Sequence, residues 1–508
     1  MNPGPRCKVA IVGAGPVGLA LAIDCALRGL SVVVIDDHDS AKQGSRAICW
    51  SKRSLEIFDR LGVGSRMLDK GVTWKVGRLY RGDEELWSFD LLPEPGHRMP
   101  AFVNLQQHYV EAYLAERAAE FPGLIELRWR HRVAGVAAGA QGAALTIETP
   151  HGPYRLDAEW VVACDGARST LRRLLGLDFA GQRFEERFLI ADVELDDDVP
   201  SERRFWFDPP FHDGRSALLH KQPDRICRVD LQLGPGADPD LERRPENVLP
   251  RLERMFGHRR FRLDWVSVYA FECRRLEKFV HGGRVIFAGD AAHVVSPFGA
   301  RGGNGGIQDA DNLAWKLALV ASGAAPLDLL ATYDEERIAA ADENIANSAR
   351  ATAFMTPKTA IEAVFRDAVL DLARDHDFAR RLVNSGRLSQ PASLAGLSLQ
   401  TPPGDDAPAG FPVGAAMADA PLAGSDWLLN RFGSGFALLA VAAEPPPGLP
   451  QELPVVRIDE PTALLAARYG KGMFYLVRPD QHVAARFSAP AAATAIVAAW
   501  RRAQGRSR

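Results

Sequence analysis

Apolar residues in this chain form several short runs, and three of these runs lead into an aspartate. Residues 32–35 precede Asp36 directly, residues 160–163 precede Asp165 across one cysteine, and residues 285–288 precede Asp290 across one glycine. Short apolar runs of this length predict buried strands. Three strand-to-acid junctions in one chain are hard to attribute to chance, so we expect them to serve a common site.

The third junction also leads into a helix. Gly289 ends the predicted strand, and beyond a loop rich in proline and glycine the apolar residues from Ile307 to Leu317 recur at helical spacing. Such a junction presents the Asp290 carboxylate beside backbone N–H groups that point along a helix axis. That combination can bind a large cofactor through its hydroxyls and direct a partial positive charge at an electron-rich ring.

Between residues 176 and 283 the pattern changes to β-strands. Alternation places Arg228, Asp230 and Gln232 on one face of a strand and Val229 and Leu231 on the other. We expect a mostly antiparallel sheet over the cofactor, and a hairpin from residues 75–100.

Helices are predicted from Thr332 to about residue 386, and residues 401–410 form a linker rich in proline, glycine and aspartate. The last hundred residues alternate strands with helices, which predicts a small α/β domain. It contains no cysteine and therefore cannot perform dithiol chemistry.

A glycine-rich turn follows the first apolar run. Gly13, Gly15 and Gly18 lie between a predicted strand and a predicted helix, and Asp36 follows the next strand. In a dinucleotide-binding unit the first glycine makes the tight turn, the second lets the backbone approach a pyrophosphate, and the third lets helix and strand pack closely. Asp36 would then bind the adenosine ribose.

Two other positions offer groups to a phosphate or a cofactor edge. Arg46 precedes a short amphipathic helix and could bind phosphate oxygens in pairs, although a solvated surface arginine is an equal alternative. Gln106 and Gln107 begin another helix, where solvated glutamines are the commoner case.

The composition excludes several classes of function. The chain has 508 residues, of which 61 are basic and 64 acidic, for a formal net charge of −3. This length predicts roughly three structural units, and the charge balance provides no basic face for nucleic acid. Six scattered cysteines indicate neither a disulfide framework nor a metal site. The first apolar run is too short for a signal peptide or a membrane span, so we expect a cytoplasmic protein.

Together, three motifs resemble those of single-component FAD-dependent aromatic hydroxylases, of the para-hydroxybenzoate hydroxylase and phenol hydroxylase type. The motifs are Gly13-x-Gly15-x-x-Gly18, Cys164-Asp165-Gly166-Ala-Arg168-Ser169 and Ala288-Gly289-Asp290-Ala291-Ala292-His293. The loop from Ser296 to Asp309 and the ending from Tyr475 to Arg486 look most like 3-(3-hydroxyphenyl)propionate hydroxylases and phenol hydroxylases.

The resemblance implies an α/β fold with an FAD-binding Rossmann-like domain interleaved with a mainly antiparallel β-sheet substrate domain. It also implies a C-terminal thioredoxin-like α/β domain without redox cysteines. We expect the FAD-binding domain in residues 1–75, 101–178 and 276–350, the substrate domain in 76–100 and 179–275, a helical connection in 351–400, and the thioredoxin-like domain in 401–508.

The resemblance also implies a set of cofactor-binding residues. They are Gly13, Gly15, Pro16, Val17, Gly18, Asp36, Asp37, Arg46, Gln107 (with Gln106 as the alternative), Asp165, Gly166, Gly289, Asp290, Pro297, Gly302, Gly303 and Asn304. In the family, Asp165 and Gly166 correspond to a pair implicated in both FAD and NAD(P)H binding. The family loop Gly-Gln-Gly-Met-Asn reads Ala300-Arg301-Gly302-Gly303-Asn304 here, which predicts an arginine near the flavin edge or its entrance. Phenol hydroxylase has an aspartate where Ile48 stands, so that base is absent.

The reaction implied by the resemblance starts with reduction of FAD by NAD(P)H. Oxygen then gives a flavin C4a-hydroperoxide, which hydroxylates a phenolic ring. His220, Tyr269 and Asp230 are candidate bases for the phenolic proton, although each is more often an ordinary sheet residue. Arg228 could bind a substrate carboxylate or pair with a neighbouring acid. The partners are a small aromatic substrate and O2, with a homodimer left open. The alternatives are a hydroxylase of a larger polyketide-like aromatic, a flavin dehydrogenase or reductase, and a non-enzymatic flavin-binding protein.

Overall fold

The computed structural model describes residues 6–39, 47–212, 214–234, 236–296, 299–383, 390–404 and 410–506, without the side chains of residues 183, 185 and 186. Two candidate residues, Arg46 and Pro297, lie outside these ranges. No described helix is both long and apolar enough to cross a membrane.

A parallel sheet forms the centre of the first layer, as the strand-to-acid junctions predict. Its strands β18 (Val285–Phe287), β11 (Tyr154–Ala163), β1 (Arg6–Val12), β2 (Val32–Ile35) and β8 (Ile125–Arg128) run parallel in that order. At the edges β17 (Val280–His281) pairs antiparallel with β18, and the hairpin of β9 (Arg132–Gly139) and β10 (Gly142–Glu148) extends from β11. The carboxyl ends of five strands thus lie at one edge of the sheet.

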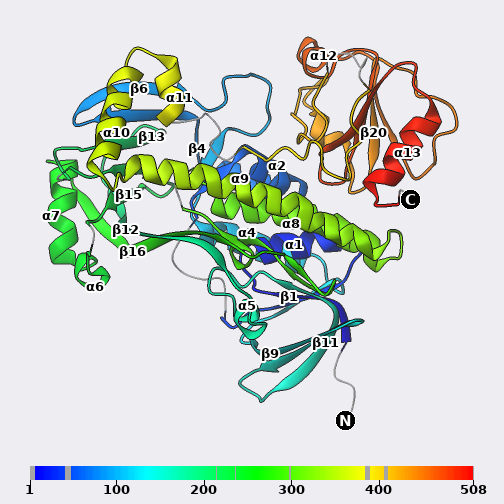
Figure 1. The fold of residues 1–508 in the computed structure, drawn as a ribbon, viewed down its shortest axis with the longest axis horizontal. Coiled ribbons are helices and arrows are strands. Elements are labelled where there is room, and N and C mark those ends of the chain that lie inside the picture. Colours follow the sequence, from blue (N-terminus) through cyan, green and yellow to red (C-terminus); the bar gives the residue numbers. More distant parts are fainter. Residues whose placement is uncertain are drawn as a thin grey trace.

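Helices cover one side of this sheet. Helix α1 (Pro16–Leu27) packs between α8 (Gly302–Ala321) and α4 (Gln107–Ala119). The apolar residues of these strands and helices form the largest buried cluster of the described chain, with Val34, Leu21 and Ile307 fully buried. Figure 1 shows α8 and α9 (Ala331–Met355) crossing the middle of the molecule beside α1.

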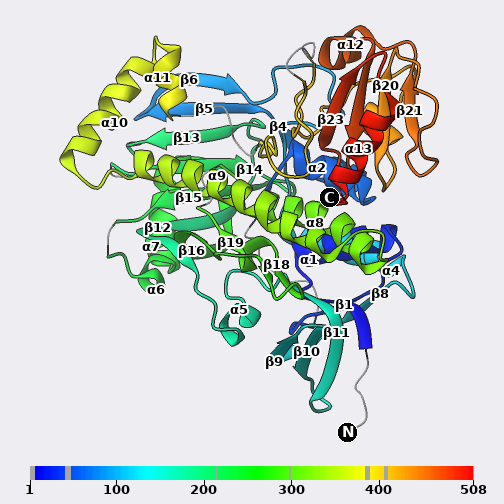
Figure 2. The same cartoon turned by 45° about the vertical axis from the view of Figure 1, so that its right-hand side comes forward.

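The second sheet is mainly antiparallel, as expected. Its order is β19 (His293–Val294), β16 (Phe261–Arg275), β12 (Ala180–Leu195), β15 (Ile226–Gln232), β14 (Ala217–Lys221), β13 (Arg203–Phe207), β5 (Val76–Arg81) and β6 (Glu84–Asp90). Only β13 and β5 pair in parallel. The hairpin predicted in residues 75–100 is thus β5–β6, and it extends the distant substrate sheet (Figure 2).

The two faces of the second sheet are different, as the alternation in β15 predicts. Val229 and Leu231 are buried against α7 (Pro245–Phe256), a helix that the sequence pattern did not reveal, and α6 (Pro239–Glu242) precedes it. Arg228 and Asp230 lie on the opposite face. At the far end of the sheet lie α10 (Ala360–Ala373) and α11 (Asp377–Val383).

A small third sheet joins the two layers. It consists of β3 (Cys49–Ser51), β7 (Phe102–Asn104) and β4 (Val72–Trp74). In the sequence, α2 (Lys52–Arg60) follows β3, and α3 (Gly64–Lys70) precedes β4. The Asn104 side chain accepts a hydrogen bond from the Trp74 indole at 2.7 Å and donates one to the Lys221 carbonyl of β14 at 2.8 Å. This contact holds the small sheet against the second sheet.

The C-terminal residues form a separate α/β unit with a thioredoxin-like fold. The strands β21 (Val455–Ile458), β20 (Ala437–Val441), β22 (Met473–Val477) and β23 (Val483–Ser488) make a mixed sheet, with α12 (Ala463–Tyr469) and α13 (Ala493–Ala503) beside it. The domain boundaries given above stay a prediction.

Candidate functional site

The glycine turn lies where the parallel strands end. Gly13 has a φ of +108°, and a Cβ there would meet the Cys164 carbonyl oxygen at 2.4 Å. A Cβ on Gly18 would lie 2.0 Å from the Gly13 carbonyl oxygen, whereas at Gly15 the nearest atom is a Glu111 oxygen at 4.0 Å. Gly13 and Gly18 are therefore required by packing, and Gly15 keeps an open backbone approach, as a pyrophosphate needs.

Asp36 is held rigidly at the end of β2. Its Oδ2 accepts a hydrogen bond from the Ala14 amide at 2.7 Å, and its Oδ1 accepts one from the His38 amide at 2.9 Å. These bonds lower the pKa of Asp36 although burial acts in the opposite direction. A fixed, ionised carboxylate beside the glycine turn suits a ribose diol, while its neighbour Asp37 is more exposed.

The two candidate glutamines differ in their environment. Gln107 donates to Glu111 at 2.8 Å and accepts from the Ala47 amide at 3.1 Å. Gln106 is buried, and its Oε1 has no hydrogen-bond partner among the described residues. The structure therefore makes Gln106 at least as good a candidate for a ligand contact as Gln107.

Asp165 and Gly166 follow β11, the strand next to β1. Asp165 Oδ2 accepts hydrogen bonds from the amides of Thr170 and Leu171 at 2.7 and 3.1 Å, at the start of α5 (Thr170–Leu174). Its Oδ1 is buried without a described partner, and burial raises the pKa of the carboxyl. This oxygen is therefore able to accept a hydrogen bond from a ligand.

Asp290 lies in a 3-10 turn directly after β18, and its backbone is fixed by a residue that the sequence analysis did not single out. Asp309 on α8 is fully buried and accepts hydrogen bonds from the Gly289 amide at 2.9 Å, from His293 Nε2 at 2.7 Å and from Arg337 Nε at 2.6 Å. His293 and Arg337 lower the pKa of Asp309 against the effect of burial. Asp309 thus couples the strand exit to α8; a buried acid 19 residues after Asp290 gave no periodic signal.

The amino end of α8 is held against β3. Asn304 accepts from the Ser51 amide at 2.9 Å and donates to the Cys49 carbonyl at 2.9 Å. Gly302 and Gly303 form the first turn, where backbone N–H groups lack intrahelical partners and carry a partial positive charge. Arg301 is buried and donates to Asn344 of α9 at 2.9 Å, so this contact directs the expected arginine toward α9.

Contacts lead from α8 to the polar face of the second sheet. Cys49, whose carbonyl receives Asn304, has its Sγ 3.8 Å from His220 Nδ1 on β14. Burial, Arg203 and Arg228 lower the pKa of His220 well below its usual value, so this imidazole is neutral. Through Cys49, His220 is thus linked to the amino end of α8.

Arg228 pairs with a neighbouring acid, which is one of the two possibilities left open by the sequence. It donates to both oxygens of Asp192 on β12, each at 2.7 Å, and both side chains are buried. Gln222 donates to the same carboxylate at 3.2 Å. Arg228 is thus committed to Asp192.

Asp230 and Arg203 are charged groups that the described structure leaves without hydrogen-bond partners. Burial raises the pKa of Asp230 to about 6, and its Oδ1 is an orphaned buried atom. Arg203 is opposite His220 in the sheet, and burial lowers its pKa. The sequence analysis missed Arg203 because an arginine in an aromatic-rich strand carries no motif. Tyr269, two strands from β15, packs its ring 6.4 Å from that of Trp265.

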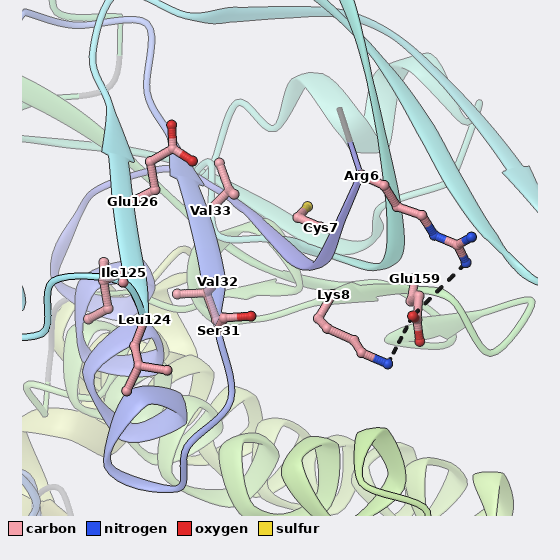
Figure 3. A pocket seen from close by; sticks show the side chains of 11 residues that line it. Arg6, Cys7, Lys8, Ser31, Val32, Val33, Leu124, Ile125, Glu126 and Glu159 are labelled. Carbon is pink, nitrogen blue, oxygen red and sulfur yellow. Dashed lines mark ion pairs between the residues drawn. The ribbon is translucent and has the colours of Figure 1, made fainter. Parts of the chain in front are cut away.

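One surface hollow lies elsewhere. It is lined by Arg6, Lys8 and Glu159, with residues of β2 and β8, at the amino ends of the parallel strands (Figure 3). Lys8 pairs with Glu159 at 3.0 Å. Dinucleotides bind at the carboxyl ends of such strands, so this hollow is not the cofactor site.

The residues at the carboxyl edge fit FAD. The ends of neighbouring strands carry one feature each. The ionised Asp36 follows β2, the open Gly15 follows β1, the orphaned oxygen of Asp165 follows β11, and the amino end of α8 comes after β18. Backbone bonds tie these ends together, from Gly13 to Ile35 at 2.8 Å and from Cys164 to Val12 at 2.7 Å. This order matches a ligand with an adenosine, a pyrophosphate and an electron-rich ring.

Known proteins agree with this assignment. A family model described as FAD binding domain matches residues 6–348. A flavin-dependent monooxygenase of Mycobacteroides abscessus is 34% identical over 65% of this chain and 71% of its own. A 12-dehydrotetracycline 5-monooxygenase/anhydrotetracycline 6-monooxygenase of Streptomyces rimosus is 31% identical over 72% of this chain and 73% of its own. A 3-(3-hydroxy-phenyl)propionate/3-hydroxycinnamic acid hydroxylase of Mycolicibacterium smegmatis is 30% identical over 73% of this chain and 65% of its own.

Solved structures share the architecture. The p-nitrophenol 4-monooxygenase PnpA from Pseudomonas putida has a TM-score of 0.67 at 26% identity, over 76% of this chain and 98% of its own. The flavin-dependent monooxygenase PieE, solved with FAD and substrate, has a TM-score of 0.81 at 21% identity over 99% of this chain and 100% of its own, which shows the same fold. The resemblance drawn from the three motifs is thus confirmed, and the chain belongs to the FAD binding domain family as an FAD-dependent monooxygenase.

Proposed function

We propose that this enzyme hydroxylates a phenolic ring, with NAD(P)H as the reductant and O2 as the source of the inserted oxygen. Bound FAD would supply the redox and oxygen chemistry of this reaction. The observation that carries the proposal is Asp230, an unpartnered carboxyl with a pKa of about 6 on the sheet face that reaches α8 through Cys49 and His220.

Asp230 would accept the phenolic proton. A general base works best when its pKa lies near the working pH, and Asp230 meets that condition because burial raises its pKa. His220 is a weaker base because its pKa is lowered. Tyr269 lies on β16, two strands away from Asp230 on β15. Removing the phenolic proton makes the ring more electron-rich at the ortho and para carbons.

The remaining residues would position the ring and exclude water. The amino end of α8 directs partial positive charge to where negative charge develops, and Asn304 holds that helix end against β3. Phe205 and Leu218 are buried on the same face as Asp230 and contribute an apolar wall. Water exclusion protects a reactive oxygen species from loss.

Arg203 supports an acidic phenol as the substrate. Its guanidinium has no hydrogen-bond partner in the described chain, and an arginine binds a carboxylate through paired hydrogen bonds. Strand β14 separates β13 from β15, so Arg203 and Asp230 start on strands about 10 Å apart. A ring with a carboxylate at one end and a hydroxyl at the other would engage both groups.

A second candidate is a larger polyketide-like aromatic. Two relatives at 31% identity are named for tetracycline monooxygenation, and OxyS anhydrotetracycline hydroxylase has a TM-score of 0.74 at 25% identity. Such a substrate would bind by its fused rings with little dependence on Arg203. The cytoplasmic location expected from the sequence stays a prediction.

A substrate panel tests these proposals. Purified holoenzyme with NADH or NADPH is supplied with simple phenols, hydroxylated aromatic acids and a fused-ring polyketide, while O2 consumption and product mass are followed. We expect an aromatic acid to stimulate O2 consumption. The product should contain one oxygen atom from isotopically labelled O2. Dye reduction without O2 incorporation would instead indicate a dehydrogenase or reductase, and preference for the fused rings would favour the second candidate.

A further inference from the structure

The helices α10 and α11 expose an uninterrupted apolar stripe. On α10 the outward residues Ile361, Val364, Phe365 and Leu372 are 79, 68, 57 and 44% exposed. On α11, Phe378 and Leu382 are 61 and 50% exposed. Six of the ten large hydrophobic residues exposed among the described residues lie in these two short helices.

The stripe follows helical geometry. Val364 and Phe365 lie three and four residues after Ile361, and Leu372 lies seven residues after Phe365. Ala368 fills the position between Phe365 and Leu372, and on α11 Phe378 and Leu382 are four residues apart. The opposite side of α10 is already used, because Val369, Leu370 and Ala373 are buried. Each helix of this pair therefore has two apolar faces, one that serves the fold and one that the described chain leaves uncovered.

A helix cap and two ion pairs hold the α10–α11 pair to the substrate sheet. Thr359 and Glu362 form a capping box at the start of α10. Arg81 of β5 pairs with Asp371 at 2.8 Å, and Arg374 pairs with Glu84 of β6 at 2.9 Å. Figures 1 and 2 place the pair at the edge of the molecule, away from the C-terminal domain.

We propose that this surface binds a second copy of the chain, so that the α10–α11 pairs of two protomers form a four-helix bundle about a two-fold axis. A two-helix face with an apolar stripe is half of such a bundle. A two-fold interface uses the same patch on both subunits, and this patch can complement itself.

The area of the stripe suits a dimer. Six large apolar side chains that are each 44–79% exposed form a patch on the order of several hundred Å². Monomeric proteins rarely expose a larger apolar patch, and a stable interface buries about 800 Å² per partner, rim included.

The charges beside the stripe favour a protein copy over a lipid surface. Glu362, Asp371 and Asp375 are exposed on α10 and its end, and Arg374 and Arg381 are exposed nearby. Asp371 and Arg374 pair with Arg81 and Glu84 of the same chain, so their charges are balanced within the protomer. Helices that lie on membranes have lysine and arginine beside the apolar face, and here acids predominate.

The interface would also support the substrate sheet. Leu370 and Ala373, on the inner side of α10, share a buried cluster with Phe205 and Leu218, which lie on the Asp230 face. Dimerisation would hold α10 against this cluster. The FAD groove lies at the other sheet and would be unaffected.

The test measures the mass of the holoenzyme in solution by sedimentation over a range of micromolar concentrations. We expect a dimer for the native chain and a monomer for Phe365→Asp, with unchanged far-ultraviolet circular dichroism and FAD content. Leu327→Asp, at a residue that is 43% exposed elsewhere on the surface, is the matched control and should stay dimeric.

A crosslinking measurement guards against a variant that fails to fold. Phe365→Cys near a two-fold axis should give a covalent dimer upon oxidation, whereas Leu327→Cys should not. A native chain that stays monomeric, a Phe365→Asp variant that stays dimeric, or a monomer that binds anionic phospholipid vesicles through this stripe would each overturn the proposal. None of these readouts depends on which aromatic the enzyme hydroxylates.

Discussion

Arg478 of the C-terminal domain and Glu336 of α9 form a fully buried ion pair. Arg478 donates to both carboxylate oxygens, with the NH2 contact at 2.9 Å, and both side chains have no exposed surface. Lys316 of α8 donates to the same carboxylate at 2.7 Å, and Asp480 accepts from Arg478 and from the Trp315 indole. Through these bonds the C-terminal domain is fixed to α8, the helix whose amino end Asn304 holds against β3.

Glu336→Gln should destabilise the protein by about 3–5 kcal/mol, because Lys316 would lose its buried anion and Arg478 would keep only Asp480. Urea unfolding followed by tryptophan fluorescence measures the change, and FAD release should precede it. Arg457→Ala is the control, because Arg457 pairs with Glu444 and Asp459 on the surface, where such pairs contribute about 0–1 kcal/mol. Equal losses in both variants would contradict a structural role for the buried network.

The glycines of the β1–α1 turn should respond differently to alanine. Gly18→Ala places a Cβ 2.0 Å from the Gly13 carbonyl oxygen and should lower thermal stability even without cofactor. Gly15→Ala meets no protein atom closer than 4.0 Å and should keep the melting temperature of the apoprotein, while weakening FAD by about tenfold or more, which is about 1.4 kcal/mol. Gly435→Ala, in open space, should change neither quantity. Calorimetry and flavin fluorescence titration distinguish the three.

The Asp230 carboxyl should make the protein less stable as pH rises. Its folded pKa of about 6 lies above the ordinary value of 3.8, so the folded state binds more protons in this range, and the free energy of unfolding falls between about pH 4 and pH 6. Asp230→Asn removes this effect and should be more stable than the native chain at pH 7.5, by roughly 1–3 kcal/mol, and no more stable at pH 4. Unfolding curves at the two pH values check the difference. A constant gap would mean that Asp230 does not titrate in this range.

The activity of the holoenzyme should rise with pH through the pKa of the same carboxyl, whereas the stability falls. If Asp230 accepts the phenolic proton, kcat/KM rises with pH through about 6 because the ionised form is the base. Asp230→Asn should lower kcat about 10²–10⁴-fold and remove that limb of the profile. An unaltered profile would exclude Asp230 as the base, and a substrate with an already ionised phenol should restore part of the rate.

Arg203 and Arg228 should behave differently when each is replaced by methionine. Arg203→Met removes a half-buried guanidinium that makes no hydrogen bond in the described chain and interacts with Asp230 only electrostatically, so stability should change little, while KM for an aromatic acid should increase about tenfold or more. Arg228→Met leaves Asp192 buried and unpaired, which should destabilise the protein by about 3–5 kcal/mol. Steady-state kinetics with an acid and with its neutral amide analogue measure the first effect. Equal KM changes for the two compounds would show that Arg203 does not bind the acidic group.

The sequence by itself predicted the strand-to-acid junctions at the carboxyl edge of the parallel sheet, because each junction follows an apolar strand whose length and spacing are local properties. Gly13, Gly18, Asp36 and Asp165 could be found without knowing what lies beside them, and the structure places all four at one edge. The alternation in β15 likewise gave the correct faces, since side chains of a strand alternate regardless of its neighbours.

Only the tertiary structure decided which polar residues are paired. Arg203 and Arg228 look equivalent in sequence, but strand order puts Asp192 beside Arg228 and leaves Arg203 across from His220. Asp309 has its partners 16 to 28 residues away, and Glu336 and Arg478 are 142 residues apart, distances over which no periodic pattern operates. Local hydrophobic periodicity specifies the helices and strands. Whether a charged side chain in the interior finds a partner of opposite charge depends on which of these elements become neighbours.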